Sequence, residues 1–323
     1  MMFLVVLGHL MLFSYGGNPP ILHHLYASFD VAVFFFVSGI FFGVRFKSTV
    51  KDKSLYIFRK AVYLLFPAFV FSQIGHLKDG KFSAIITDGF GFYWFLPALF
   101  WSMFTLYAID LLTNLLKKPR IYDCIVYTLG AILIVCNLVF KDIPRLGFVQ
   151  LNSVVAYLPF LIIGGGYRGG NQRIMRLLDA PILSSLLVLT AVVSFVLYLL
   201  TIRHCFDSFI DLSCLKDLFV SLCILACFFR YQHCFESESK VNSFLALVGR
   251  YTLPIYLLHY YFLPDLNWLR CIIGENSTVL VLLILIVIAV AIIGLCVLFT
   301  KIISTSDFFG HYLLGQKSNK FKI

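Results

Sequence analysis

Charge is scarce in this sequence. Only 13% of the 323 residues are Asp, Glu, Lys or Arg, whereas 60% are hydrophobic and 17% are aromatic. The mean hydropathy is +0.92. A soluble domain carries about 25% charged residues, so this chain has too little polar surface to be wetted as a globule. The composition excludes a soluble enzyme, a disordered chain and a soluble nucleic-acid-binding protein, and it favours a protein embedded in lipid.

Several organising features are also missing. The chain has no C-x-x-C pair, fixed-period repeat, low-complexity tract or long linker. Its nine cysteines are scattered, mostly within apolar runs, so they predict neither a metal site nor a disulfide framework. Cys205 and Cys214 would pair only on an oxidising side, and two unpaired thiols are expected. No basic segment precedes the first apolar run, so a cleaved signal peptide is not expected.

Long apolar runs are what the sequence does contain. A helix needs about 20 apolar residues to cross the hydrocarbon layer. Uncharged runs bounded by charges or turn residues predict helices near 2–15, 29–45, 56–76, 92–113, 122–140, 150–167, 181–202, 213–230, 243–264 and 277–301. The first is too short to span. Either the natural start lies upstream of Met1, which we expect, or the first helix is truncated and lacks its cytoplasmic end. The predicted fold is therefore all-α, a polytopic bundle of about ten transmembrane helices.

The distribution of Lys and Arg predicts the orientation of these helices. Positive residues gather in cytoplasmic loops. With a cytoplasmic N-terminus, ten alternating spans place 19 of the 26 Lys and Arg residues inside and 7 outside. Both termini are predicted to be cytoplasmic, with a single membrane domain over 1–303 and a short basic tail over 304–323. Anchoring in an inner (plasma) membrane explains the net charge of +10, and it needs no nucleic-acid partner.

Histidines inside the membrane are candidates for chemistry, because ionisable groups there are costly. His9 and His259 fall in the first and ninth predicted helices, each roughly 8–9 Å below the outer end. They could face one cavity, or each could simply bond a neighbouring helix. Imidazole has an ordinary pKa near 6.5, so a neutral histidine can remove a hydroxyl proton at neutral pH.

A basic cluster lies at the cytoplasmic ends of the second and third predicted helices. It places six cations within sixteen residues: Arg45, Lys47, Lys51, Lys53, Arg59 and Lys60. Such a cluster could hold the phosphates of a nucleotide-bearing donor. Anchoring on the cytoplasmic side explains at least four of the six without any ligand.

Five segments resemble, in their order along the chain, the acyltransferase-3 family of polytopic membrane O-acyltransferases, many of which modify bacterial cell-surface sugars. They are Leu-Val-Val-Leu-Gly8-His9, Phe-Phe-Phe-Val-Ser38-Gly39, Phe-Arg59-Lys60 with Pro67 downstream, Trp94-Phe-Leu-Pro-Ala-Leu and Ile-Tyr256-Leu-Leu-His259. Each alone is consistent with packing or interfacial anchoring. The resemblance covers most of the chain, although the fifth, seventh, eighth and tenth helices match in hydropathy only.

The resemblance implies roles for particular residues. His9 matches the catalytic base of the family, whereas the donor-binding Arg expected about ten residues earlier would precede Met1. The family also places two basic residues on the third helix. Lys60 matches the first, Tyr63 stands at the second, and we expect Arg59 to substitute.

The predicted function is transfer of an acyl group, acetyl most simply, from acyl-CoA to a hydroxyl of a cell-surface or lipid-linked glycan. The predicted partners are therefore the bilayer, the acyl-CoA donor and the glycan acceptor, with no metal and no bound cofactor. Direct transfer is expected, because no Ser or Cys has the context of an activated nucleophile. Arg45, Arg59 and Lys60 are the candidates for donor binding. The acceptor or site-lining candidates are Asp30, Ser38, Trp94, Tyr256 and His259.

A transporter or exporter of a small solute or glycan intermediate is the main alternative. Against it, the halves of the chain carry no matching Gly/Pro-broken helices, and Asp110 is the only approximate intramembrane acid suited to ion coupling. A third hypothesis is a polytopic glycosyltransferase that acts on lipid-linked sugars. Such enzymes commonly need an acidic residue in the first outer loop, and residues 16–28 contain none.

Overall fold

The computed structural model describes residues 1–15, 24, 27–43, 49–78, 89–118, 120–140, 147–168, 181–202, 212–231, 234, 239–269 and 278–316. These residues form helices and the turns between them, with no strand in this part of the chain, which confirms the all-α prediction. The chain divides into two compact units, Met1–Asp30 with Tyr231–Ile323, and Val31–Arg230. The predicted membrane domain is thus built from two units.

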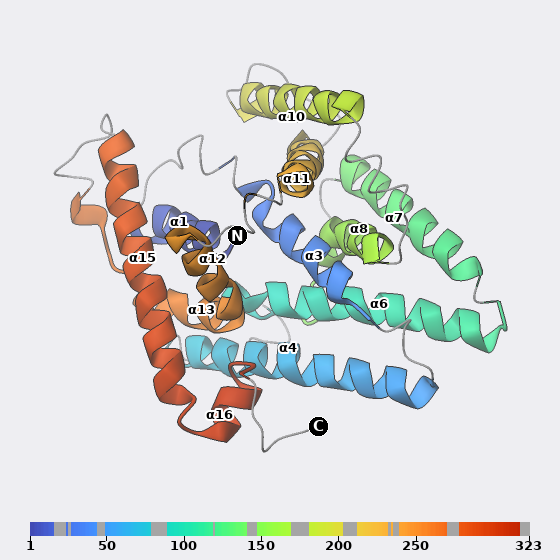
Figure 1. The fold of residues 1–323 in the computed structure, drawn as a ribbon, viewed down its shortest axis with the longest axis horizontal. Helices are drawn as coiled ribbons and strands as arrows, with labels where there is room; N and C mark the ends of the chain where they lie inside the picture. The colour runs from blue at the N-terminus through green and yellow to red at the C-terminus, as the bar shows by residue number, and fades with distance from the viewer. Residues whose placement is uncertain are drawn as a thin grey trace. The chain divides into compact units, whose positions relative to one another are not determined.

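The first unit joins the two ends of the chain. It contains α1 (Met2–His9), the π-helix η1 (Leu10–Tyr15), α12 (Lys240–Arg250), α13 (Thr252–Leu258), the 3₁₀-helix η5 (His259–Phe262), α15 (Thr278–Ile303) and α16 (Asp307–Tyr312). Both α1 and α13 pack against α15, and α1 also contacts α12 and α13. The first helix therefore lies against elements that follow it by more than 200 residues (Figure 1). Part of the predicted tail forms α16, where His311 is buried.

The second unit is a continuous segment of the chain. Its elements are α3 (Asp30–Phe41), α4 (Val50–Lys78), the 3₁₀-helix η3 (Gly91–Tyr93), α6 (Phe95–Leu115), α7 (Ile121–Val139), α8 (Leu151–Arg168), α10 (Pro181–Ile202) and α11 (Leu212–Arg230). The helix α6 packs against α4, α7 and α8, while α10 pairs with α11 (Figure 1).

Within the described residues, five helical segments are long and apolar enough to cross a membrane: Val50–Gly75, Gly91–Leu115, Ile121–Val139, Ser184–Thr201 and Val279–Ile303. The bent pair Lys240–Arg250 and Thr252–Phe262 would make a sixth. A helix covers each of the ten predicted ranges, yet several of these helices are too short for a span by themselves, so ten crossings and the orientation of the termini stay predictions.

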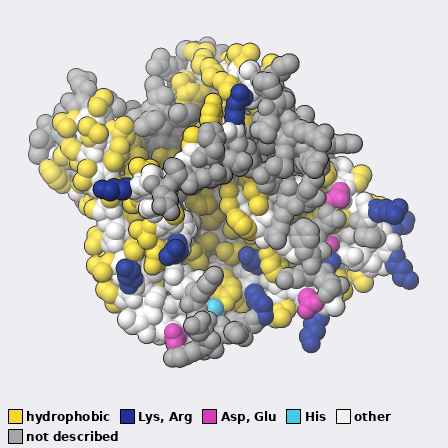
Figure 2. Space-filling model, in the orientation of Figure 1, with side chains coloured by type: hydrophobic (Ala, Val, Ile, Leu, Met, Phe, Trp, Pro, Cys, Tyr) yellow, Lys and Arg dark blue, Asp and Glu magenta, His cyan; other side chains and the backbone are white. Residues whose placement is uncertain are grey.

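Apolar side chains on the outside of the helices fit a lipid environment. Leu189 of α10 is 58% exposed and Val287 of α15 is 68% exposed, and hydrophobic side chains cover much of the face drawn in Figure 2. Since water disfavours such surfaces and hydrocarbon does not, these two helices are suited to contact lipid.

The helix α4 begins six residues before the predicted start at 56. The hydroxyl of Thr49 accepts a hydrogen bond from the backbone N–H of Asp52 at 3.1 Å and donates one to its carboxylate at 2.8 Å. Such a cap satisfies N–H groups that the first turn leaves unpaired. The predicted start at 56 is wrong because Thr49 caps the helix ahead of the charged residues 51–53, which belong to its first turn.

The ninth predicted helix is also corrected. Instead of one helix over 243–264, α12 and α13 meet at Tyr251 with a bend of 68°. Pro254 explains the bend, because its ring nitrogen cannot donate to the carbonyl of Arg250 and its ring collides with that carbonyl in a straight helix.

A close crossing of α3 and α8 depends on glycines from two of the sequence motifs. A Cβ atom on Gly39 would collide with the backbone oxygen of Leu161, and one on Gly164 would collide with the backbone oxygen of Phe36. Small residues allow helix backbones to approach in this way. The predicted role of the Ser38–Gly39 pair in close packing is therefore confirmed for Gly39.

We expect Gly164→Val to destabilise the protein by at least about 3 kcal/mol. Inserted methyl groups cost about 1–3 kcal/mol where side chains can move aside, and here backbone atoms block the space. The matched control is Gly294→Val, because no described atom beyond the neighbouring backbone of its own helix lies within 4 Å of a Cβ built on Gly294. Thermal unfolding of both purified variants in micelles measures the difference, and equal midpoints would contradict the assigned crossing.

Candidate functional site

His9 is the last residue of α1, where the backbone changes from α-helix to the π-helix η1. Its Nδ1 lies 2.7 Å from Nε2 of His259, a residue 250 positions later in the chain. The two ring planes differ by 8° and the ring centroids are 5.0 Å apart. Parallel rings that share so short an N···N contact lie edge to edge in nearly one plane, as a hydrogen-bonded imidazole pair does.

His259 is held by the bend in its own segment. It ends α13 and begins η5, and it is completely buried. Its Nδ1 lies 2.9 Å from the backbone oxygen of Ile255. Both ring nitrogens therefore have a hydrogen-bond partner, which satisfies the requirement for a buried polar side chain.

Tyr260 completes this cluster, and the sequence did not single it out. Its hydroxyl lies 3.2 Å from Nε2 of His9, and its ring centroid is 4.8 Å from that of His9 and 4.1 Å from that of His259. Neighbouring residues of a regular α-helix point about 100° apart, so no sequence signal indicated that both His259 and Tyr260 contact His9. The change from α13 to the tighter η5 allows it.

Aromatic rings form the apolar side of the cluster. Phe13, on η1, has its ring centroid 5.5 Å from that of His9 and 6.3 Å from that of Tyr260. Tyr256 is buried, and its ring centroid is 6.3 Å from that of His259. The predicted site residues His9, Tyr256 and His259 are thus brought together in the first unit.

Asp30 belongs to the first unit and lies near enough to Tyr260 of the cluster to interact with it electrostatically. Asp30 is half-buried in the first turn of α3. Arg45 lies outside the described residues. The predicted roles of these two residues stay predictions.

The other predicted site residues belong to the second unit. Ser38 is half-buried on α3 beside the glycine crossing. Trp94 precedes α6, and its ring stacks on that of Tyr157 of α8 with centroids 6.0 Å apart. The Trp94 ring therefore helps to pack this unit.

Arg59 and Lys60 lie on α4, and both are half-buried. The Nε atom of Arg59 is buried and has no hydrogen-bond partner among the described residues. The ammonium of Lys60 lies 5.4 Å from the ring centroid of Tyr56, a cation–π distance. A buried guanidinium nitrogen without a partner is costly, so Arg59 is suited to accept an anionic ligand.

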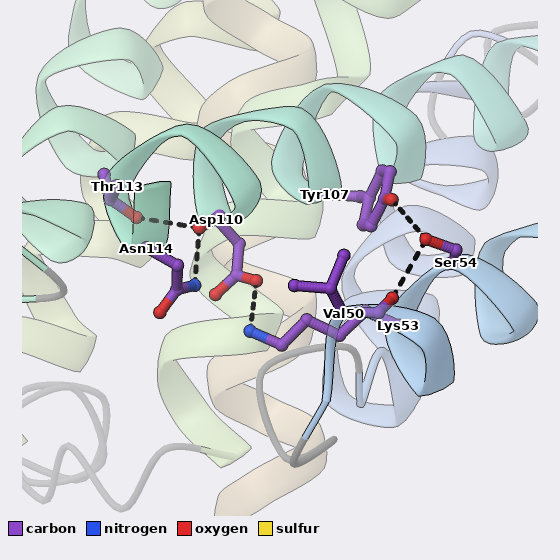
Figure 3. Close-up of polar contacts among 7 residues, drawn as sticks. All are labelled: Val50, Lys53, Ser54, Tyr107, Asp110, Thr113 and Asn114. Carbon is purple, nitrogen blue, oxygen red and sulfur yellow. Dashed lines mark hydrogen bonds and ion pairs between the residues drawn. The ribbon is translucent and has the colours of Figure 1, made fainter. Parts of the chain in front are cut away.

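Lys53, another member of the basic cluster, has a partner within the protein. Its ammonium donates to the carboxylate of Asp110 on α6 at 2.5 Å (Figure 3), and both side chains are at most 10% exposed. The hydroxyls of Ser54 and Tyr107 are 2.9 Å apart and form a second link between the two helices. Lys53 is therefore occupied in joining α4 to α6.

A small pocket in the second unit, which the sequence did not indicate, is lined mostly by apolar atoms together with a few polar side chains. It has a volume of about 140 Å³ and lies among α7, α8 and α11, with Asn137, Ser213 and Asp217 beside Tyr157 and Cys214. The carboxylate of Asp217 is 2.9 Å from the ammonium of Lys216. In the described parts of the chain, this pocket included, no group of three or more His, Cys, Asp or Glu side chains is arranged to hold a metal ion.

The arrangement of the first unit is suited to proton transfer. A neutral imidazole accepts a proton at one nitrogen while the other keeps its hydrogen bond. Comparison with known proteins adds the reaction class: a family model described as an acyltransferase domain, that of the acyltransferase-3 family, matches residues 1–301. No curated protein and no solved structure matches the chain.

Proposed function

The chain belongs to the acyltransferase-3 family, as a membrane acyltransferase, and we propose that it transfers an acetyl group from acetyl-CoA to a hydroxyl of a cell-surface or lipid-linked glycan. The observation that carries this proposal is the hydrogen-bonded pair of His9 and His259 in apolar surroundings. Such a pair provides a base that can act on a hydroxyl without a bound cofactor.

In the proposed reaction, His9 removes the proton of the acceptor hydroxyl. The hydroxyl oxygen then attacks the carbonyl carbon of the thioester, and the carbon–sulfur bond breaks. The protonated His9 returns the proton to the departing thiolate, so the base is regenerated in each cycle. This is direct transfer, with no acyl-enzyme.

The proposed donor site lies on the cytoplasmic side. Arg45, Arg59 and Lys60 hold the phosphates of CoA, and the buried Nε of Arg59 without a partner among the described residues supports this assignment. Both termini are proposed to be cytoplasmic, in an inner membrane, with ten crossings. Transport is not favoured, because Asp110, the acid named for ion coupling, is paired with Lys53.

The first test is transfer of labelled acetyl from acetyl-CoA to envelope glycans by the purified chain in vesicles. For Arg59→Gln combined with Lys60→Gln, we expect the KM for acetyl-CoA to rise about 10- to 100-fold with little change in kcat, since a hydrogen bond to a charged group contributes about 1.5–3 kcal/mol. Lys301→Gln is the control, because Lys301 is an exposed cation at the end of α15.

Three outcomes would count against the proposal. Failure to transfer label from acetyl-CoA and from longer acyl-CoAs would refute acyl-CoA as the donor. Label that reaches no glycan would refute the acceptor class. An unchanged KM in the double variant would remove Arg59 and Lys60 from donor binding.

A further inference from the structure

The hydrogen bonds around His259 determine which of its nitrogens carries a proton. A carbonyl oxygen only accepts, so the contact between the Ile255 oxygen and Nδ1 of His259 at 2.9 Å requires N–H at Nδ1. A neutral imidazole has one N–H. In neutral His259 the other nitrogen, Nε2, is therefore an acceptor.

The same reasoning extends to His9. Since Nε2 of His259 accepts, Nδ1 of His9 must donate across the 2.7 Å contact. Neutral His9 then has its lone pair on Nε2, the nitrogen that lies 3.2 Å from the hydroxyl of Tyr260. Tyr260 donates in that contact, because an unprotonated ring nitrogen only accepts.

We infer that His259 is a positioning residue that sets the tautomer of His9, so that Nε2 of His9 is the nitrogen that takes the acceptor proton. The inference rests on the proposed acyl transfer, and it adds the atom that acts, the residue that selects it and the position of the acceptor. The acceptor hydroxyl takes the place of the Tyr260 hydroxyl beside Nε2.

The proton balance of the reaction supports this arrangement. When Nε2 takes the hydroxyl proton, His9 becomes an imidazolium whose Nδ1–H still donates to His259. The positive charge is thus stabilised by the same hydrogen bond that selected the tautomer. After the carbon–sulfur bond breaks, Nε2 gives the proton to the thiolate, and the original tautomer is restored without rearrangement of the pair.

Without an acceptor at position 259, the other tautomer becomes available. In it the proton sits on Nε2 and the lone pair on Nδ1, which faces away from Tyr260 and the acceptor position. In a serine-protease triad, replacing the group that holds the histidine in the right tautomer lowers kcat by about 10⁴. Removing the acceptor at position 259 is therefore expected to lower kcat strongly in this protein.

The activity test compares His259→Leu with His259→Gln. Leu removes the acceptor, and we expect kcat to fall at least about 100-fold with an unchanged KM for acetyl-CoA. The side-chain oxygen of Gln can accept from Nδ1 of His9, so this variant should keep kcat within about tenfold of the parent. Equal kcat values for the two variants, or parallel losses of kcat and thermal stability, would overturn the inference.

Nitrogen-15 NMR of histidine-labelled protein in lipid tests the tautomer without any acyl transfer. The signals absent from the His9→Gln spectrum identify His9, and loss of the same signals in His9→Asn checks this identification. We expect Nδ1 of His9 to be protonated and Nε2 to be unprotonated. The reverse pattern would overturn the inference even if transfer is observed, whereas the expected pattern in a protein without transfer would refute the proposed function and leave the tautomer assignment standing.

Discussion

His9→Gln is expected to lower kcat for acyl transfer by at least about 10³, close to the upper range for a general base. Gln can still share a hydrogen bond with Nε2 of His259, so the packing between α1 and α13 is retained. A neutral amide cannot take a proton at neutral pH. The KM for acetyl-CoA should change little, because the proposed donor groups lie on α4 and in the segment before it.

The matched control for this experiment is His311→Gln. His311 is also a buried histidine of the first unit, and its Nδ1 lies 3.0 Å from the backbone oxygen of Gln316. Its replacement tests whether the loss of any buried histidine would inactivate the chain. Full activity of His311→Gln beside an inactive His9→Gln supports His9 as the base. If His9→Gln keeps more than a tenth of the parent rate, the base must be another group.

Lys53→Met is expected to lower the free energy of unfolding by about 3–5 kcal/mol, because it leaves the Asp110 carboxylate buried and unpaired. Lys53 lies in the first turn of α4 and Asp110 in the last two turns of α6. Each charge is thus at the helix end that its own macrodipole disfavours, and the contact between the two charges offsets this cost. Asp110→Leu should cost a similar amount by leaving the ammonium without its carboxylate.

The double variant Lys53→Met with Asp110→Leu tests whether the stability loss of each single variant comes from breaking the ion pair. Replacing both partners of a buried ion pair by apolar side chains is often neutral or stabilising by about 1–4 kcal/mol. We therefore expect the double variant to regain most of the stability that either single variant loses. Lys51→Met, an exposed position on the same helix, should leave the midpoint unchanged.

Thermal unfolding in micelles, with the parent and all four variants purified in the same way, provides these values. An additive double variant would show that the two side chains do not interact. In that case the contact drawn in Figure 3 does not stabilise the crossing of α4 and α6.

The positions of the helices follow from local sequence. Hydrophobic runs and their charged borders are enough to locate helices near all ten predicted ranges. Two predicted helix boundaries are wrong. Thr49 caps α4 within a charged stretch, so this helix starts earlier than predicted, and Pro254 bends the ninth helix. Both signals were present in the sequence, because caps and prolines act over one turn.

Side-chain pairs that join distant segments differ in how far the sequence alone could predict them. Equal depths in parallel helices made His9 and His259 plausible neighbours, since depth can be counted along each helix. The contact of Lys53 with Asp110 was not anticipated, because the basic cluster has several cations and nothing local distinguishes the one that faces α6. The same holds for Arg59, whose buried Nε becomes visible only once α4 is packed.

By itself the sequence determined the membrane class, the helical fold, the acyltransferase family and the histidine proposed as base, because composition, hydrophobic run length and motif order are local properties. Only the tertiary structure decided that His259 bonds His9, that Tyr260 lies at the other nitrogen, and that the Ile255 carbonyl orders the protons between them. Hydrogen-bond roles depend on which atoms meet across the fold to within a few tenths of an ångström. That precision comes from the bend at Tyr251 and the packing of α1 and α13 on α15.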